Sequence, residues 1–98
     1  MCRKIYGDFA RLCFQLFGDR VKYWLTFNEI HSFVQLGYQN GLFAPGRCSP
    51  PYGDCPKGDS QHEPYIAGHN ALNGHAHVVN IYRTEFQVIF ETQVLLMF

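Results

Sequence analysis

The stretch VKYWLTFNEIHSF, residues 21–33, places a nearly continuous apolar run directly before an amide, a carboxylate and an imidazole. The β-branched and aromatic residues of 21–27 predict a strand that is covered on both faces, as the strands of a parallel sheet are. Parallel strands of α/β proteins carry functional groups at their C-terminal ends. Glu29 is therefore a candidate catalytic carboxylate, and the alternative is a solvated loop residue or a helix cap.

The sequence around Glu29 indicates how its carboxyl group could work. Trp24, Phe27 and Phe33 are large apolar neighbours along the chain. Packing against them would remove part of the water around a carboxylate, and desolvation favours the protonated form of a carboxyl group. We therefore expect Glu29 to be partly desolvated and suited to donate a proton near neutral pH.

Helical patterns flank the predicted strand. Between Asp8 and Gly18 the apolar residues recur at the spacing of an amphipathic helix; they are Phe9, Leu12, Cys13, Leu16 and Phe17. Asp8 suits the N-cap of this helix and Gly18 its C-terminal stop. A second helix is predicted to open at Pro64, with a core-facing stripe of Leu72, Ala76, Val79 and Phe86.

The segment between strand and second helix lacks regular patterns for most of its length. A short helical or irregular stretch is expected over 31–38. A long loop is expected over 41–62, because its prolines and glycines disfavour any regular element. The order helix, strand, long loop, helix indicates an α/β fold class. It leaves the strand 21–27 without a partner, although its backbone groups need one.

Length, composition and charge limit the function classes. The chain has 98 residues, enough for one small domain, and its hydrophobic fraction of 47% is typical of a globular core. Eight basic residues balance eight acidic ones, so nothing favours nucleic acid or an anionic membrane as a partner. The sequence shows no signal peptide and no run of membrane-spanning length, and it leaves the location of the protein open.

The residues Thr26-Phe27-Asn28-Glu29 resemble the Thr-Phe-Asn-Glu-Pro signature of the family 1 glycoside hydrolases, the β-glucosidase family. Further blocks resemble the plant branch of that family in the same order; they are FGDRVKYW, GLFAPGRCS, GDS, EPYIAGHN and IYR. The resemblance extends from about residue 6 to residue 86. It departs from the signature at Ile30, which stands in place of the proline.

The resemblance implies a (β/α)8 TIM barrel, of which this chain would be a fragment. Its parts would be a helix, the fourth barrel strand, the long βα loop and the following helix. Residues 1–98 would form a partial barrel segment, with the family-like region over 6–86 and a divergent apolar tail over 87–98.

The resemblance also implies roles for single residues. Glu29 would be the general acid/base, Asn28 would hydrogen-bond the sugar 2-hydroxyl, and His31 would contact the leaving-group side of a β-glucoside or remain a solvated loop residue. A retaining glycosidase needs a second carboxylate about 5–5.5 Å away as nucleophile. The family's Thr-Glu-Asn-Gly nucleophile block is not in this sequence. We therefore expect β-glucosidase-type chemistry without a cofactor, from a chain that is inactive alone.

A non-catalytic role is the alternative. The chain would then be an interaction or regulatory fragment that binds a full-length relative through its unpaired strand, or the product of a decayed gene. A carboxylate in the nucleophile motif would favour the enzyme. The acidic residues near or after the long loop do not stand in that motif; they are Asp54, Asp59, Glu63, Glu85 and Glu91.

The resemblance implies a disulfide between Cys48 and Cys55, and two free thiols are the alternative in a reducing compartment. Cys48, Cys55, His62 and His69 recur every seven residues and offer the ligand types of a tetrahedral zinc site. Zinc modules keep paired ligands closer together, so we expect no metal. The histidines of the second helix are expected to pack or to face solvent; they are His69, His75 and His77.

Overall fold

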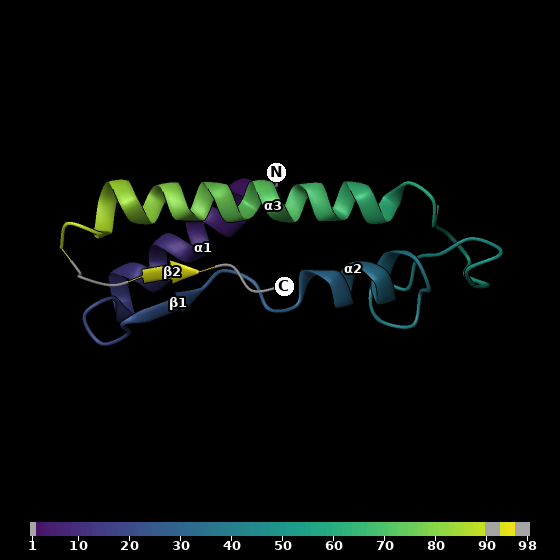
Figure 1. The fold of residues 1–98 in the computed structure, drawn as a ribbon, viewed down its shortest axis with the longest axis horizontal. Coiled ribbons are helices and arrows are strands. Elements are labelled where there is room, and N and C mark those ends of the chain that lie inside the picture. The colour runs from purple at the N-terminus through teal and green to yellow at the C-terminus, as the bar shows by residue number, and fades with distance from the viewer. Residues whose placement is uncertain (1, 90–92, 96–98) are drawn as a thin grey trace. The chain divides into compact units, whose positions relative to one another are not determined.

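The computed structural model describes residues 2–89 and 93–95. Its elements are α1 (Cys2–Phe17), β1 (Tyr23–Leu25), α2 (Ile30–Tyr38), α3 (Glu63–Ile81), the π-helical segment η1 (Tyr82–Phe86) and β2 (Gln93–Leu95) (Figure 1). The described chain divides into two units, residues 2–28 with 71–89 and 93–95, and residues 29–70. Among the described helices, none combines the length and the apolar character that crossing a bilayer requires.

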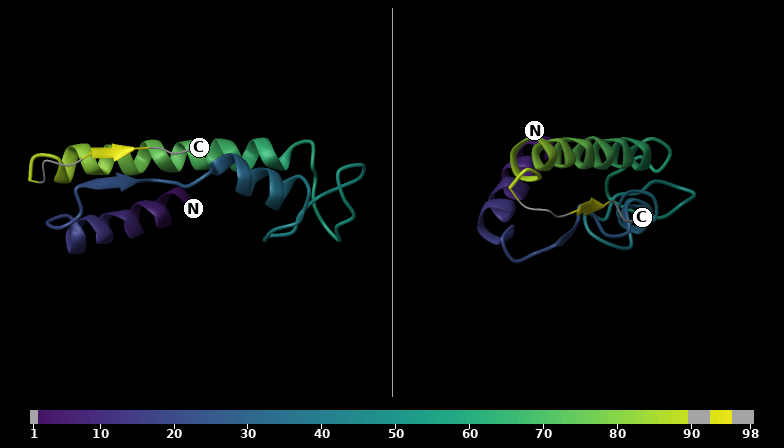
Figure 2. Two further views of the ribbon diagram at one scale, coloured as in Figure 1. Left: turned by 60° about the horizontal axis from the view of Figure 1, so that its bottom comes forward. Right: turned by 60° about the vertical axis from the view of Figure 1, so that its left-hand side comes forward.

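The sheet lies in the first unit. β1 and β2 pair in parallel, with Tyr23 opposite Gln93 and Leu25 opposite Leu95, and they run side by side (Figure 1, Figure 2). α3 lies in the connection between them, as a parallel pair requires a long crossover. The expectation that the strand has no partner is therefore wrong, because residues 93–95 of the predicted tail supply one.

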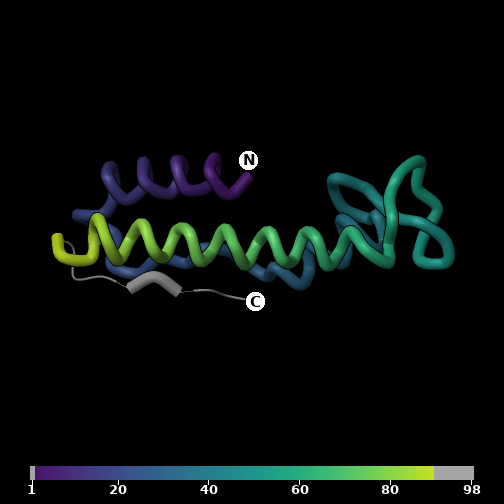
Figure 3. The backbone as a smooth tube through the Cα atoms, turned by 90° about the horizontal axis from the view of Figure 1, so that it is seen from above, coloured from purple at the N-terminus to yellow at the C-terminus, as the bar shows by residue number. Residues whose placement is uncertain are grey.

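The core of the first unit forms where α1 runs beside the later part of α3 and η1 (Figure 3). Its buried residues are Ala10, Phe14, Val78, Ile81, Tyr82 and Phe86. The Phe14 ring is central, because its centroid lies 4.9 Å from that of Trp24, 5.2 Å from that of Tyr82 and 5.4 Å from that of Phe86. Aromatic pairs at such distances contribute about 0.5–1.5 kcal/mol each beyond the area that they bury.

The buried faces of both helices differ from the predicted stripes. α1 buries Gly7, Ala10 and Phe14, and α3 buries Ala71, Gly74, Val78 and Ile81. The predicted residues that are exposed instead are Phe9, Leu12, Leu16, Phe17, Leu72 and Ala76. Small residues explain the choice of face: a Cβ added at Gly7 would lie 2.5 Å from His77 Nε2. α1 therefore approaches the His77 and Ile81 side chains of α3 closely at Gly7, which has no side chain of its own.

α1 starts six residues earlier than Asp8, the predicted N-cap. Asp8 lies inside the helix, where its carboxylate accepts a hydrogen bond from Lys4 Nζ at 3.2 Å and lies 3.5 Å from Arg11 Nη1. Pairs of opposite charge at these spacings support a helix that continues through Asp8. The predicted stop is confirmed, since α1 ends at Phe17 and the Gly18 N–H donates to Phe14 O.

β1 is shorter and more open than predicted. It covers Tyr23–Leu25 rather than residues 21–27, and these residues pair with Gln93–Leu95 of β2. Tyr23 is 69% exposed and Leu25 is 52% exposed. The prediction of a strand covered on both faces is therefore wrong for the described structure.

The second unit consists of α2, the long loop and the beginning of α3. The helical stretch predicted over 31–38 and the helix predicted from Pro64 are both confirmed to within one residue. The long loop between them is confirmed as well, and an isolated antiparallel β-bridge links Cys48 in the loop to Asn40 just before it. Ile30, at the start of α2, is buried.

Candidate active site

Glu29 has an unusual backbone conformation. It is the N-cap residue of α2, with φ 47° and ψ 60°, in the left-handed region. Among the described residues it is the only one other than glycine with a positive φ. Such a conformation costs a residue with a side chain on the order of 1–3 kcal/mol, and strained residues of this kind cluster at functional sites. The strained backbone conformation therefore occurs at Glu29, the residue that the sequence predicts to be a catalytic carboxylate.

The first turn of α2 holds Glu29. Its carbonyl oxygen accepts hydrogen bonds from the backbone N–H groups of Ser32 at 3.0 Å and Phe33 at 3.3 Å. The Ser32 hydroxyl donates to Glu29 Oε2 at 3.1 Å. Glu29 is exposed, so the expected desolvation is wrong for this structure. The Glu29 carboxylate accepts its hydrogen bond from Ser32 in the first turn of α2. The apolar residues near it in the sequence do not bury it.

The two other predicted site residues flank Glu29 along the chain. Asn28 precedes it, at the end of the first unit, and is exposed. His31 follows it in the first turn of α2 and is also exposed. All three side chains are thus accessible from solvent on a short segment between a strand and a helix.

Contacts that the sequence did not reveal hold the strand end before Asn28. The Tyr6 hydroxyl donates a hydrogen bond to the Thr26 carbonyl oxygen, and Thr26 Oγ1 lies 2.8 Å from His75 Nδ1. Burial lowers the pKa of His75, and the positive charge of Arg83 lowers it further. The sequence predicted that His75 packs or faces solvent and did not reveal its partner, because no local pattern connects residues 49 positions apart.

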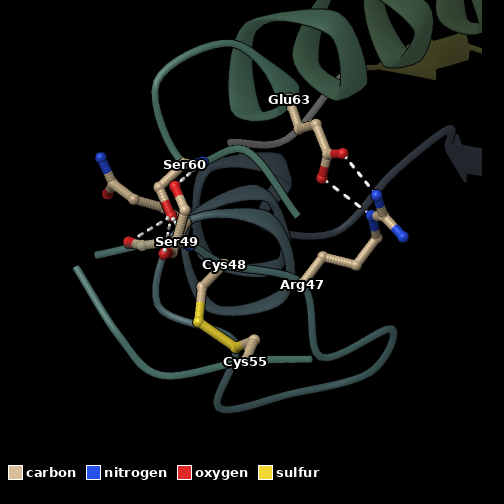
Figure 4. The surroundings of a disulfide bond; sticks show 7 residues. Arg47, Cys48, Ser49, Cys55, Ser60 and Glu63 are labelled. Atoms are coloured by element: carbon tan, nitrogen blue, oxygen red, sulfur yellow. Dashed lines mark hydrogen bonds and ion pairs between the residues drawn. A yellow bond between two sulfur atoms is a disulfide. The ribbon is translucent and has the colours of Figure 1, made fainter. Parts of the chain in front are cut away.

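The long loop contains the disulfide that the resemblance implies. Cys48 and Cys55 are joined with an S–S distance of 2.01 Å (Figure 4), and Cys48 is buried. Glycines make room for the sulfur atoms. A Cβ at Gly53 would lie 2.7 Å from Cys48 Sγ, and one at Gly41, whose φ is 72°, would overlap Cys55 Sγ. The two free cysteines are Cys2 and Cys13.

In this structure the disulfide joins both sulfur atoms of the four-residue set considered for zinc. His62 has another partner, since its Nδ1 lies 2.7 Å from Asp59 Oδ2. That hydrogen bond lowers the pKa of Asp59. Across residues 2–89 and 93–95, no group of three or more His, Cys, Asp or Glu side chains is arranged to hold a metal ion.

Polar contacts brace the loop around the disulfide (Figure 4). Arg47 binds Glu63 with two parallel hydrogen bonds, Nε to Oε2 at 2.8 Å and Nη2 to Oε1 at 2.6 Å. These bonds lower the pKa of the Glu63 carboxyl group. The buried Ser60 hydroxyl donates to the Gln39 carbonyl oxygen at 2.7 Å. The loop therefore has an ordered structure, and side-chain contacts link its ends. It follows the Glu29 segment along the chain.

Comparison with known proteins gives consistent matches. A profile described as glycosyl hydrolase family 1 matches residues 2–98. β-Glucosidase 24 of Oryza sativa subsp. japonica is 58% identical over 83 residues, which are 84% of this chain and 16% of that protein. Probable inactive β-glucosidase 14 of the same subspecies is 47% identical over 85 residues, 87% of this chain and 16% of that protein. The chain spans about a sixth of the length of these curated relatives.

Solved structures agree with the sequence matches. The crystal structure of a rice β-glucosidase superposes with a TM-score of 0.86 at 42% identity, over 94% of this chain and 20% of that chain. A β-glucosidase from the fungus Humicola insolens, in complex with glucose, superposes with a TM-score of 0.86 at 38% identity, over 93% of this chain and 19% of that chain. On both the sequence match and the structural match, the chain belongs to glycosyl hydrolase family 1.

Proposed function

We propose that this chain carries the acid/base part of a retaining β-glucosidase site. The observation that carries the proposal is the position of Glu29, which directly follows Asn28 in the family signature and has the strained left-handed backbone. Relatives named β-glucosidases support the class of reaction. The glucose complex of the fungal relative supports a small-molecule β-glucoside as substrate.

The chemistry uses Glu29 twice. In the first step the protonated carboxyl group donates its proton to the glycosidic oxygen as the C–O bond breaks, and a nucleophilic carboxylate takes the sugar. In the second step the Glu29 carboxylate accepts a proton from the water that displaces this nucleophile. Asn28 hydrogen-bonds the 2-hydroxyl, a contact that strengthens as positive charge develops on the ring. His31 contacts the leaving-group side.

The proposal includes that the chain does not hydrolyse glucosides alone. A retaining site needs two carboxylates about 5–5.5 Å apart, and this sequence has no Thr-Glu-Asn-Gly nucleophile block. We place residues 6–86 as the helix, fourth strand, long loop and following helix of a (β/α)8 barrel, with 87–98 as a divergent tail. The nucleophile would then come from another part of such a barrel.

The proposal is tested by grafting residues 6–86 into an intact family 1 β-glucosidase in place of the equivalent stretch. The 98-residue chain should not cleave a nitrophenyl β-glucoside, whereas the hybrid should. Glu29→Gln in the hybrid should remove most of the activity. Glu85→Gln, an exposed carboxylate that pairs with Arg11, is the matched control and should retain it. A Glu29→Gln hybrid as active as its parent would contradict the proposal.

A second candidate function is association with a full-length relative, in place of catalysis. Exposed apolar residues of α1 follow helical spacing and form a stripe; they are Ile5, Phe9, Leu12 and Leu16. The sheet of the described residues has two strands, so β1 has one edge that no other described strand covers. Size-exclusion chromatography of the chain mixed with a full-length relative should then give a joint peak, and Leu12→Lys should abolish it. Separate elution at micromolar concentrations would reject this candidate.

A further inference from the structure

Two helices contact the residues directly before Asn28. From α1, the Tyr6 hydroxyl donates a hydrogen bond to the Thr26 carbonyl oxygen. From α3, His75 Nδ1 lies 2.8 Å from Thr26 Oγ1. Thr26 is therefore bound through both its backbone and its side chain, by partners 20 and 49 residues away in the sequence.

The next residue, Phe27, is held by packing. Its ring centroid lies 4.8 Å from that of Tyr6, with the planes inclined by 39°. A Cβ added at Gly74 would lie 3.4 Å from Tyr6 Cδ1 and 3.6 Å from Phe27 Cζ. These are ordinary van der Waals distances, so both rings pack against α3 at Gly74.

We infer that His75 is a positioning residue, which fixes the strand end through Thr26 and so sets where Asn28 meets the 2-hydroxyl of the sugar. The inference rests on the proposed function, in which Asn28 binds that hydroxyl. Asn28 itself is exposed. Its position depends on its backbone, and the contacts of Thr26 and Phe27 fix that backbone.

The protonation state of His75 suits this role. Burial, and then the positive charge of Arg83, lower its pKa, which favours the neutral ring. A neutral imidazole has one N–H and one acceptor nitrogen, and the Thr26 hydroxyl can donate or accept. Thr26 Oγ1 and His75 Nδ1 can therefore form a hydrogen bond with either tautomer of His75.

The first test uses the 98-residue chain itself. His75→Phe removes the contact between His75 Nδ1 and Thr26 Oγ1, and amide hydrogen exchange at Phe27 and Asn28 should become about tenfold faster, as expected for the loss of one hydrogen bond. His75→Asn places an amide near the position of Nδ1 and should restore slow exchange. The control is His69→Phe, on an exposed position of the same helix, which should leave exchange unchanged. Unchanged exchange in His75→Phe would overturn the inference.

The second test uses the hybrid enzyme and two substrates, a dinitrophenyl β-glucoside and its 2-deoxy analogue. His75→Phe should lower kcat/KM for the glucoside by about 10–10²-fold, the effect of a displaced contact. The 2-deoxy analogue has no hydroxyl for Asn28, so its kcat/KM should not change. Equal losses on both substrates would mean that His75 only stabilises the fold, and would overturn the inference.

The two tests separate this inference from the proposed function. If Glu29→Gln leaves the hybrid fully active, the proposed acid/base role fails. The ratio of the two kcat/KM values still reports on Asn28 in that case, because it compares sugars with and without the 2-hydroxyl. Thr26→Ser keeps the hydroxyl and should preserve the ratio of kcat/KM for the glucoside to kcat/KM for the 2-deoxy analogue. Thr26→Val removes the hydroxyl and should lower this ratio, as His75→Phe does.

Discussion

Ser49 and Ser60 exchange hydrogen bonds across the long loop. The Ser49 N–H donates to Ser60 Oγ at 2.7 Å, and the Ser60 N–H donates to Ser49 Oγ at 2.9 Å (Figure 4). The same Ser60 hydroxyl donates to the Gln39 carbonyl oxygen. Ser60 is only 2% exposed, so water cannot replace these bonds. The buried Ser60 hydroxyl therefore links Ser49 in the loop to Gln39 at the end of α2.

Ser60→Ala should destabilise the chain by about 1–3 kcal/mol, because it removes the partner of the partly buried Ser49 N–H and Gln39 carbonyl groups. Urea unfolding followed by circular dichroism measures the change. Ser32→Ala, which removes a less buried hydroxyl, is the control and should change stability by less than about 0.5 kcal/mol. Equal effects of the two substitutions would show that the loop does not depend on the Ser60 bonds.

The disulfide between Cys48 and Cys55 should stabilise the oxidised chain. The bridge closes a loop of about eight residues, which corresponds to about 2.5 kcal/mol in the loop-entropy treatment. The double substitution of both cysteines by serine should lower the free energy of unfolding by that amount, and reduction by dithiothreitol should do the same. Peptide mapping without reduction should show Cys2 and Cys13 as free thiols. Recovery of a Cys13 crosslink as the main species would contradict this assignment.

The ion pair of Arg47 and Glu63 makes stability depend on pH. Hydrogen bonds from Arg47 hold the pKa of Glu63 below its usual value of 4.5. The unfolded chain then binds more protons between the two pKa values, so this contribution is complete above about 4.5 and is lost as pH falls through the folded value. Urea midpoints should fall in acid, and less steeply for Glu63→Gln. An equally steep fall of the urea midpoint in Glu63→Gln would show that Glu63 does not cause this pH dependence.

Two helical glycines should respond to alanine in opposite ways. Gly68 of α3 has open space around it, so Gly68→Ala should stabilise the chain by about 0.5–1 kcal/mol through helix propensity. At Gly7 the new Cβ would lie 2.6 Å from His77 Cδ2 and 3.2 Å from Ile81 Cδ1. Gly7→Ala should therefore gain nothing or destabilise. Adding His77→Ala should cancel the penalty in part, and an equal gain at both glycines would show that α1 and α3 do not meet at Gly7.

The elements with local signals could be predicted from the sequence. Pro64 and the proline-rich loop before it give the start of α3 to within one residue. The stop of α1 follows from Gly18. Asp8 misled the prediction of the helix start, because an acidic residue can cap a helix or pair with charges inside it, and only the contacts with Lys4 and Arg11 decide between the two.

The rest depends on contacts between distant residues. The partner of β1 is β2, about 70 residues later, and nothing in residues 21–27 reveals this pairing. α1 has two apolar faces, and the small residues Gly7 and Ala10 select the buried one. Glu29 and Asn28 were found through a sequence signature, whereas the partners of Thr26, Tyr6 and His75, have no signal near it in the sequence.

The acid/base role of Glu29 is tested most directly by the glycosylation rate constant of the hybrid enzyme and its Glu29→Gln variant, measured on two glucosides. An alkyl glucoside has a basic leaving group that needs a proton, so the variant should be slower by about 10²–10⁴-fold. A dinitrophenyl glucoside needs little help, and its glycosylation should change far less. Added azide should restore the second step and form the β-glucosyl azide. Equal losses on both glucosides, without rescue by azide, would contradict the role of Glu29 as the proton donor.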